Sequence, residues 1–550
     1  MACRIFYNNR AYFKALLLFF CNLKIYIMKN LFTIFLLFIS VNLFSQSTIA
    51  LDTIENDFIF SDTVYLAHDV FIDTNVTVTF LPGTKVISTG NYGFYVKGNI
   101  RAIGNEGDSV FFTRDDTTGF SDTSITAGGG WKGFYFIHTP EINDSSIFSY
   151  CHLEYGKACD TVYEESRGGL FTINNFKKFR ISHSFIINNI AKVSGGGILM
   201  EENSSGIISN NKFFKNITYN YESSGGAIFI FNNSDPLISK NLFKYNEAWG
   251  ISGSWISGAG AAIACSSADL ASVSPSIIGN RCFNNISVMG VIYESTMGTV
   301  VSNNLVCNNY GTVSNGHQLS QSIYTNNTIV NNFGIQVFIS SNQIIFYNNI
   351  IWGNRGGSNY DSTQIRLTLI TYNHQIQYNC VEFGWDDEPN NISSDPMFVN
   401  PSPGPGLDYE GDSYDWHLLN SSACINAGNP DTSGLFLPVY DLDGNPRIYG
   451  QIDMGAYENQ SISAISSIDM MNNTIAYPNP TTDFVYFTFA ENQQSIKTVS
   501  IYNMQGQIVK TGRVNKQNSK ISLKSLPAGL YFYRITENNK LLQTGKIVKQ

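Results

Sequence analysis

The sequence predicts an all-β chain, in which a long solenoid of short, stacked strands precedes a small antiparallel β-sandwich. Three observations support this fold class. A nine-residue phrase recurs through the centre of the chain, glycine clusters precede apolar strands at a similar period, and residues 475–550 alternate apolar strands with Pro, Asn and Gly turns. Only 14% of the 550 residues are charged, which suits short strands and tight turns better than surface helices.

The chain opens with a segment typical of an export signal. From Met28 it reads MKNLFTIFLLFISVNLFSQS, with one lysine, an apolar run over 31–44, and then small and polar residues. Such a run is too short to span a membrane comfortably and has the form of a secretory signal peptide. We therefore expect residues 1–46 to be a leader, translation to start at Met28, and the mature protein to have no transmembrane span.

Internal repetition determines the fold of the central region. The phrase occurs seven times, for example as ISNNKFFKN from Ile208 and VSNNLVCNN from Val301, with a weaker eighth copy from Ile376. Successive copies lie 22 to 39 residues apart, as expected for a coil repeat with inserted loops. The fourth positions of the copies are Ser184, Asn211, Asn241, Asn280, Asn304, Asn327, Asn349 and Asn379.

These repeats have a direct physical interpretation. A strand of a few residues cannot bury its apolar side alone, but coils stacked about 4.8 Å apart share a continuous core and parallel strand ladders. The repeated Asn tolerates left-handed backbone geometry and can pass amide hydrogen bonds to the Asn above and below, so we expect a structural role for it. Glycine clusters at Gly168, Gly195, Gly225 and Gly258 are expected to turn the backbone tightly before a strand.

With these repeats, residues 51–380 resemble the right-handed parallel β-helix proteins of the pectate-lyase-like class. The segments GNIRAIGNEGDSVFFT from Gly98 and GGWKGFYF from Gly129 are similar to the first coils of surface β-helix proteins from Bacteroidota. The resemblance implies a parallel β-helix over residues 47–385. It implies no particular activity, because function depends on a site rather than on a fold.

Residues 386–458 are acidic and lack the repeat. The phrases DPMF, WHL, SSACINAGNPD, DLDGNPR and IDMGAYE, in this order, resemble the closing segment of secreted bacterial β-helix proteins. We expect this segment to cap the exposed end of the solenoid. A calcium site at Asp441 and Asp443 is the alternative, although DLDG lacks the third acid before Gly444 and the distant Glu of a complete calcium loop.

Residues 459–474 are polar and are expected to form a linker to a basic tail at 475–550, which holds ten Lys and Arg but three acidic residues. The tail resembles the type A C-terminal sorting domain of the type IX secretion system. The resemblance implies interaction with that machinery, passage across a Gram-negative outer membrane, and either release or attachment to the cell surface. The motif residues are Tyr477, Pro478, Asn479, Pro480, Leu526, Pro527, Ala528, Gly529, Leu530, Tyr531, Gly545 and Lys546.

No catalytic motif such as GxSxG or HExxH is present. Asp235 and Asp269 follow strands of adjacent aligned coils, and Arg281 is a basic candidate for a lyase, but turn capping is the simpler explanation for the two acids. Aligning Ile198, Ile228, Ile263 and Val291 in successive coils places Glu201 and Glu294 in one column, three coils apart. That separation is too large for the carboxylate pair of a glycoside hydrolase.

Seven cysteines follow the leader, in no metal-binding spacing. We expect them to be small buried core residues, with one disulfide, such as Cys151 to Cys159, as the alternative. The formal net charge is −9, and because the tail is basic, the solenoid is more acidic still, which argues against nucleic acid as a partner.

We therefore expect a secreted or cell-surface protein that binds polysaccharide or another glycan along its lateral face, where exposed aromatic rings can pack on sugars. A polysaccharide lyase or glycoside hydrolase is one alternative. A structural protein or protein-binding adhesin is the other.

Overall fold

The computed structural model divides the chain into two compact units, one that ends at Asn459 and one that covers Gln460–Gln550, and each is described here by itself. The predicted leader, residues 1–46, lies outside the described residues. In the part of the chain that is described, no helix has the length and apolar character to cross a bilayer. The described residues are 47–550 except 125–127, 221–222, 251–257, 268–273, 297, 316–321, 335–336, 340–343, 357–363, 368–373, 385–388, 462–475, 489–494, 505, 516–518 and 538–539.

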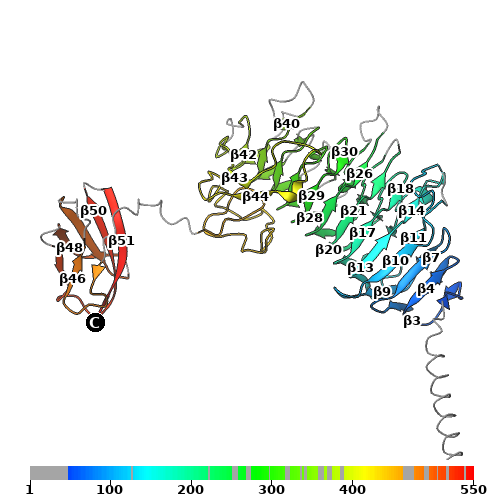
Figure 1. Ribbon diagram of the computed structural model, residues 1–550, viewed down its shortest axis with the longest axis horizontal. Helices are drawn as coiled ribbons and strands as arrows, with labels where there is room; N and C mark the ends of the chain where they lie inside the picture. The colour runs from blue at the N-terminus through cyan, green and yellow to red at the C-terminus, as the bar shows by residue number, and fades with distance from the viewer. Residues whose placement is uncertain are drawn as a thin grey trace, which may run out of the picture. The chain divides into compact units, whose positions relative to one another are not determined.

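Three long parallel sheets, here named A, B and C, form the body of the first unit (Figure 1). The chain visits them in the order B, C, A, so each coil adds one strand to each sheet. The 13 strands of sheet A are β1 (Ser47–Thr48), β4 (Thr63–Leu66), β7 (Lys85–Ser88), β10 (Val110–Arg114), β13 (Cys151–Glu154), β17 (Phe185–Ile187), β21 (Lys212–Phe214), β25 (Leu242–Lys244), β29 (Arg281–Phe283), β33 (Leu305–Cys307), β36 (Thr328–Val330), β39 (Ile350–Trp352) and β42 (Cys380–Val381).

Sheets B and C each have 12 strands. Those of sheet B are β2 (Thr53–Ile54), β5 (Val70–Ile72), β8 (Gly93–Val96), β11 (Gly133–Ile137), β15 (Phe171–Asn174), β19 (Ile198–Glu201), β23 (Ile228–Phe231), β27 (Ile263–Ser266), β31 (Ile292–Ser295), β34 (Val313–Asn315), β37 (Val337–Ile339) and β40 (Ile365–Leu367). Those of sheet C are β3 (Phe58–Phe60), β6 (Thr77–Phe80), β9 (Asn99–Ile103), β12 (Ser146–Ser149), β16 (Phe179–Ser182), β20 (Gly206–Ser209), β24 (Leu237–Ser239), β28 (Ser276–Ile278), β32 (Val300–Ser302), β35 (Ile323–Thr325), β38 (Ile345–Tyr347) and β41 (Gln375–Gln377).

The three long parallel sheets confirm the parallel β-helix that the sequence predicts. Short elements complete its coils. A fourth parallel sheet of five strands follows sheet A in the middle coils, and a 3-10 turn precedes one strand of sheet B. These elements are β14 (Lys157–Ala158), β18 (Ile190–Ala191), β22 (Ile217–Thr218), β26 (Glu247–Ala248), β30 (Ile286–Ser287) and η1 (Glu164–Ser166).

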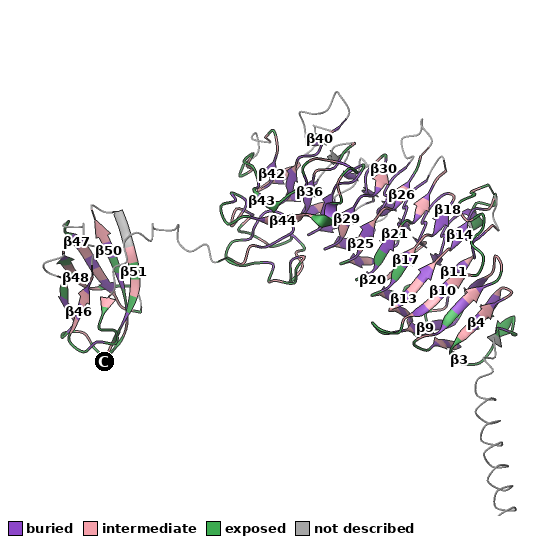
Figure 2. Ribbon diagram, in the orientation of Figure 1, coloured by how far each residue is buried: buried purple, intermediate pink, exposed green. Residues whose placement is uncertain are grey.

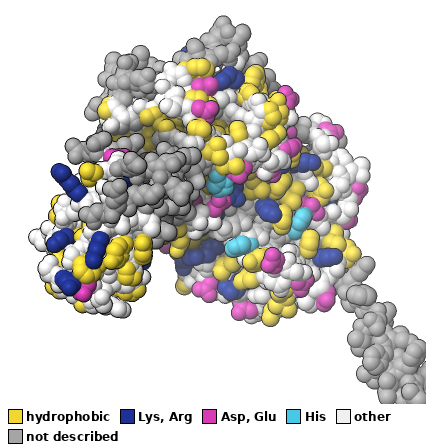
Figure 3. Space-filling model, turned by 60° about the vertical axis from the view of Figure 1, so that its left-hand side comes forward, with side chains coloured by type: hydrophobic (Ala, Val, Ile, Leu, Met, Phe, Trp, Pro, Cys, Tyr) yellow, Lys and Arg dark blue, Asp and Glu magenta, His cyan; other side chains and the backbone are white. Residues whose placement is uncertain are grey.

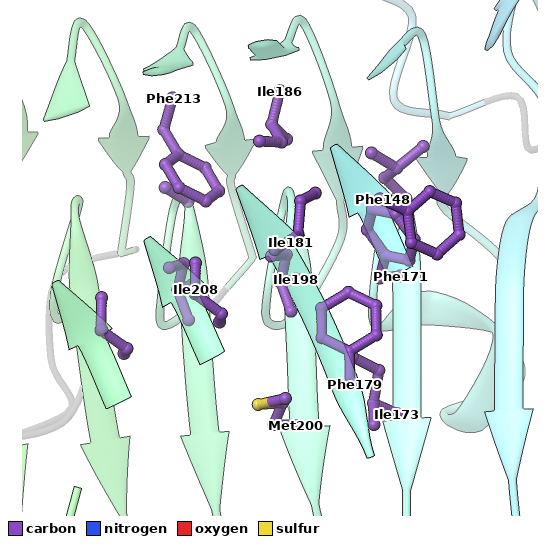
Figure 4. Close-up of a cluster of buried hydrophobic side chains, with 14 of the residues drawn as sticks. Phe148, Phe171, Ile173, Phe179, Ile181, Ile186, Ile198, Met200, Ile208 and Phe213 are labelled. Carbon is purple, nitrogen blue, oxygen red and sulfur yellow. The ribbon is translucent and has the colours of Figure 1, made fainter. Parts of the chain in front are cut away.

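Inward-pointing side chains form one continuous core that stays in register from coil to coil (Figure 4). Phe94, Phe134 and Phe171 stack on successive strands of sheet B, with ring centroids 5.3 and 5.1 Å apart. Ile181 and Ile208 pair in the same way in sheet C. Full burial of each such side chain contributes about 1.5–3 kcal/mol to the stability of the fold. This burial requires stacked coils, because a single coil would leave both of its edges exposed to water.

A ladder of buried Asn runs along the corner between sheets C and A. Nδ2 of Asn211 donates to Oδ1 of Asn241 at 3.0 Å, and the same oxygen accepts the main-chain N–H of Asn211 at 2.9 Å. Nδ2 of Asn211 also donates to the Ile181 carbonyl at 3.0 Å. This pattern confirms the structural role predicted for the repeated Asn. The ladder contains Asn211, Asn241, Asn280, Asn304, Asn327, Asn349, Asn379 and Asn391.

The left-handed backbone expected at the fourth position of the phrase is wrong for the first ladder. The residue before the ladder Asn takes that conformation instead, with φ 57° at Asn210 and 59° at Asn303. That residue turns the corner, which leaves the next Asn free to direct its amide into the stack.

A second ladder, which the sequence analysis did not identify, follows sheet A at the ninth position of the phrase. It contains Asn189, Asn216, Asn246, Asn285, Asn309, Asn332, Asn354 and Gln364.

The glycine clusters turn the chain into sheet B, as predicted. Gly195 has φ 66°, and a Cβ added there would lie 2.7 Å from the Ile198 carbonyl oxygen. Gly225 has the same φ in the next coil. A side chain at either position would be strained by the backbone and would also meet the main chain of the strand that follows.

The residues after sheet A, 389–458, are here called the cap segment. Asn391 extends the first ladder and Ile392 bridges to Cys380, so the segment begins by covering the end of sheet A. It then packs along the outer face of the last coils, where Trp416 and Met454 join a buried cluster with Leu305 and Ile350. It therefore covers a flank as well as the end. Its elements are β43 (Phe398–Asn400), η2 (Gly411–Ser413) and β44 (Asp415–Leu418).

The second unit is a small antiparallel β-sandwich, as predicted. Its two sheets enclose a core that includes Val485, Ile501 and Ile535. One sheet contains β45 (Ala476–Tyr477), β46 (Phe484–Phe487) and β49 (Lys520–Ser522). The other contains β48 (Ile508–Val514), β47 (Lys497–Tyr502), β50 (Gly529–Glu537) and β51 (Lys540–Lys549).

Replacing one ladder residue should destabilise the β-helix strongly. Asn280→Ala removes the donor to Asn304 and the acceptor for Asn241, and it leaves their buried polar groups unpaired. Because a buried unsatisfied group costs about 1–3 kcal/mol, we expect a loss of roughly 2–4 kcal/mol in the free energy of unfolding, measured by urea denaturation. Asn400→Ala, at an exposed position, is the control and should change it by less than about 0.5 kcal/mol. Equal losses in the two variants would contradict the ladder's role.

Candidate functional site

The outer face of sheet A carries a column of side chains in exact register from coil to coil, here called the sheet A column. One residue from each of seven successive strands occupies it, so it runs about 29 Å at the usual strand spacing of about 4.8 Å. Every member is at least partly exposed. Figure 2 shows intermediate and exposed stretches, in pink and green, on strands of the β-helix. The members are Lys85, Phe111, His152, Phe185, Lys212, Leu242 and Arg281.

Three stacked rings lie between two lysines in this column. The His152 imidazole stacks between Phe111 and Phe185, with centroid distances of 5.2 and 5.8 Å. The Lys85 Nζ lies 5.8 Å from the Phe111 ring centroid, and the Lys212 Nζ lies 4.9 Å from that of Phe185. The five side chains therefore form one continuous surface that is apolar at its rings and positive at both ends.

A carboxylate borders this surface. Oε2 of Glu154 lies 3.2 Å from Nε2 of His152, and Oε1 accepts the Thr113 hydroxyl at 2.8 Å. Burial disfavours the Glu154 carboxylate, but these two hydrogen bonds outweigh burial and hold its pKa below the usual value. The carboxylate is thus ionised at neutral pH and orients the imidazole at the centre of the column.

The column ends in a cleft of about 560 Å³ between sheet A and the cap segment. Lys212, Leu242 and Arg281 form its floor, and the turn at 438–444 forms one wall. Tyr440 lines this wall and is 49% exposed, so its ring is available to a bound molecule. Acidic, basic and histidine side chains gather on the face of the β-helix shown in Figure 3.

Charged side chains meet beside this cleft. Arg281 donates to Oδ1 of Asp443 at 3.2 Å, the other Asp443 oxygen bonds Nε2 of His417, and Nδ1 of His417 lies 2.5 Å from Asp415. Burial disfavours the charged imidazolium, but the bonds to the two carboxylates outweigh it and raise the pKa of His417. The Tyr457 ring packs on His417, with centroids 4.1 Å apart. The two carboxylates therefore favour the imidazolium form of His417.

Two of the three sequence-predicted catalytic residues are described, and they lie at different sheets of the β-helix. Asp235 is exposed in the turn before β24 of sheet C, where its N–H donates to the Ser204 carbonyl, whereas Arg281 begins β29 of sheet A. Asp269 lies outside the described residues. The predicted alignment of Glu201 with Glu294 is wrong by one residue, because Ile263 pairs with Ile292. Glu294 consequently faces the core.

The two calcium candidates have other partners. Asp441 is buried, and its Oδ1 accepts the N–H groups of Asp443 and Asn445 at 3.0 and 2.8 Å. Its Oδ2 accepts the N–H of Glu458, and Asp443 bonds Arg281 and His417. Across the described ranges, no cluster of three His, Cys, Asp or Glu side chains is arranged to hold a metal ion.

A buried charge network anchors the end of the cap segment. The Arg447 guanidinium donates to Glu458 at 3.1 Å and to Oδ1 of Asn303 in sheet C's corner at 2.9 Å. Asp453 and Asp441 lie close enough to Arg447 to favour its charge. Burial raises the pKa of Glu458 to about 7, because the positive charge of Arg447 does not offset the loss of solvation of the Glu458 carboxylate.

The second unit brings its sequence motifs together. Nδ2 of Asn479 donates to the Lys546 carbonyl, and its Oδ1 accepts the Val548 N–H, both at 2.8 Å. This side chain therefore joins the Tyr477–Pro480 motif to the last strand. The Tyr531 hydroxyl donates to the Pro527 carbonyl at 2.8 Å, within the motif that spans 526–531. Gly545 lies against Tyr533, where an added Cβ would be 2.5 Å from the ring.

Comparison with known proteins agrees with this structure. Residues 475–550 match the family described as "Secretion system C-terminal sorting domain". The second unit is a sorting domain. It indicates export by the type IX secretion system, as the motifs imply. The chain is also 27% identical over 188 residues to Karilysin of Tannerella forsythia, a match that covers 30% of this chain and 38% of that protein. The chain thus matches less than half the length of that relative.

Sequence reasoning did not identify the sheet A column or His417. The column needs the register between coils, which loops of unequal length hide. His417 was visible only as part of the WHL phrase, and its partner Asp443 is 26 residues away. The alternation of β17, with Phe185 exposed, Ile186 buried and Ile187 intermediate, was the available signal for an outward ring.

The network at Glu458 predicts that the protein loses stability as the pH rises. The folded state binds a proton up to about pH 7, whereas the unfolded Glu releases it near pH 4.5, so stability falls between these values. The raised pKa of His417 acts in the same direction above about pH 6.5. We expect a lower melting temperature at pH 8 than at pH 5, measured by calorimetry, and a smaller difference in Glu458→Gln. A melting temperature that rises over this range would contradict the assignment.

Proposed function

We propose that this is an exported surface or secreted protein that binds a polymeric glycan along the sheet A column and in the cleft at its end. The observation that carries the proposal is a run of three stacked rings flanked by lysines, in register on an open, lateral face. Aromatic faces pack on the apolar faces of sugar rings, while Lys and Arg pair with carboxylate or sulfate groups. Sugars that carry such acidic groups are therefore the preferred ligands.

The geometry suits a chain rather than a small molecule. The column extends over about 29 Å, which is the length of several sugar units in a row. The first unit is acidic in total, so a positive strip on it is a local feature that selects acidic polymers over neutral ones. Retention on the cell surface or release into the medium would both place this face in contact with external glycans.

A polysaccharide lyase or hydrolase is the second candidate. It is favoured by the contacts of Asp443 with Arg281 and with His417 at the cleft, since a carboxylate and an imidazole in contact can hold and transfer a proton. An adhesin that binds protein through the same face is the remaining alternative. Incubation with a polysaccharide panel separates the three. Retention alone supports glycan binding, and shortening of a polymer supports the enzyme. The absence of both retention and shortening favours the adhesin.

Removing one ring from the column should weaken glycan binding. Phe185→Ala takes away the ring between His152 and Lys212, and we expect the affinity for the retained polymer to fall roughly threefold to tenfold, because an aromatic contact contributes about 0.5–1.5 kcal/mol. Titration calorimetry measures the change. Phe71→Ala removes an exposed ring from sheet B and should leave the affinity unchanged. Equal effects of the two substitutions would exclude the column as the binding surface.

The sorting domain should be required for export. In a host that has the type IX machinery, a chain without residues 475–550 should accumulate in the periplasm, while the full chain reaches the surface or the medium. Immunoblots of the cell fractions distinguish the two locations. Appearance of the shortened chain outside the cell would show that another signal directs its export.

A further inference from the structure

Two cysteine thiols meet where the cap segment covers sheet A. Cys380 begins β42, the last strand of that sheet, and Cys424 lies after β44 in the cap segment. Both are completely buried and belong to the apolar cluster that holds the two parts together. The Cys380 thiol donates to the Ser394 carbonyl at 3.2 Å and also lies beside the Cys424 thiol, and its contact with Cys424 is the main reason that the pKa of Cys380 is raised; burial adds to it.

The main chain holds both residues in place independently of their sulfur atoms. The Cys380 N–H donates to the Asn349 carbonyl at 2.8 Å within the coil stack. The Cys424 N–H donates to Oγ of Ser422 at 3.1 Å, and its carbonyl accepts the N–H of Met454 at 3.0 Å. The two thiols are thus positioned by the fold, and little further ordering is needed to join them.

The other cysteines provide a contrast. The Cys307 thiol lies in the same cluster, but its hydrogen bond goes to the Gly411 carbonyl at 3.9 Å. Cys151 bonds the carbonyls of Ala102 and Ser149. All seven described cysteines are buried free thiols in this structure, both Cys151 and Cys159, which were the sequence-based alternative for a disulfide, and Cys380 and Cys424.

We propose that Cys380 and Cys424 form a disulfide during export, which fastens the cap segment to the flank of the β-helix. A sorting domain acts in passage across the outer membrane, after the chain has left the reducing cytoplasm, and disulfides form and persist in the compartments beyond the cytoplasm. The cross-link closes the loop from 380 to 424. It stabilises the cap chiefly by restricting the unfolded chain, in the usual entropic account.

The oxidant is a disulfide, on a thiol–disulfide oxidoreductase or on a small molecule such as oxidised glutathione. One cysteine thiolate attacks it, forms a mixed disulfide and releases one thiol. The second cysteine thiolate then attacks the bonded cysteine sulfur, which forms the Cys380–Cys424 bond and releases the second thiol. Two electrons and two protons pass to the oxidant. Because both thiols are buried once folding is complete, the exchange precedes closure of the cap segment over sheet A.

Thiol mapping tests the proposal directly. The mature chain is folded in a buffer of reduced and oxidised glutathione, denatured, alkylated without reduction, and digested for mass spectrometry. We expect five of the seven cysteines that follow the leader to be alkylated and one cross-linked peptide pair to contain Cys380 and Cys424. Alkylation of all seven, or a cross-link between other cysteines, would overturn the proposal.

A second measurement links the bond to the cap. Reductant should lower the melting temperature of the oxidised protein by roughly 3–8 °C, and it should have no effect on Cys424→Ala. Cys307→Ala, in the same buried cluster, is the matched control and should keep the response to reductant. An equal response in Cys424→Ala would overturn the assignment, even if that substitution lowers the starting stability, because each variant is compared with itself.

Discussion

The stacking of coils through buried amide ladders is the interaction on which the rest of the structure depends. A coil alone has neither a closed core nor partners for its strand edges, and each ladder Asn bonds the Asn of the next coil. The loops differ in length, so successive ladder residues lie 22 to 39 residues apart in sequence in the central coils. The geometry of the corner is nevertheless the same in each coil. The insertions are therefore excluded from the stack, and each strand stays aligned with its neighbours.

The same register creates the candidate site. Side chains far apart in sequence, such as Lys85 and Arg281, share one line on sheet A only because every intervening coil is aligned. The line is open over the early coils and ends where the cap segment covers the later ones. There Arg281 leaves the open face and pairs with Asp443 of the cap. The protein thus has one lateral surface with an exposed part, a cleft and a covered part.

Much of this could be predicted from the sequence, and the failures have physical causes. The repeated phrase identified the coils, the first ladder and the glycine turns, since these are local patterns. Val291 and Ile292 are both apolar, so pattern alone could not decide which of them faces the core, and Glu294 was assigned to the wrong face. The route of the cap segment depends on contacts such as Asn326 with Asp453, 127 residues apart, which local patterns do not encode.

Hydroxyl-radical footprinting with an acidic polysaccharide panel tests the central claim most directly, because aromatic and imidazole side chains are oxidised readily when they are exposed. The account predicts that a bound polymer protects Phe111, His152 and Phe185 together, while Phe71 on sheet B is oxidised as in the free protein. Protection of Phe71 without the column, or no protection by any polymer of the panel, would contradict a glycan-binding role for sheet A.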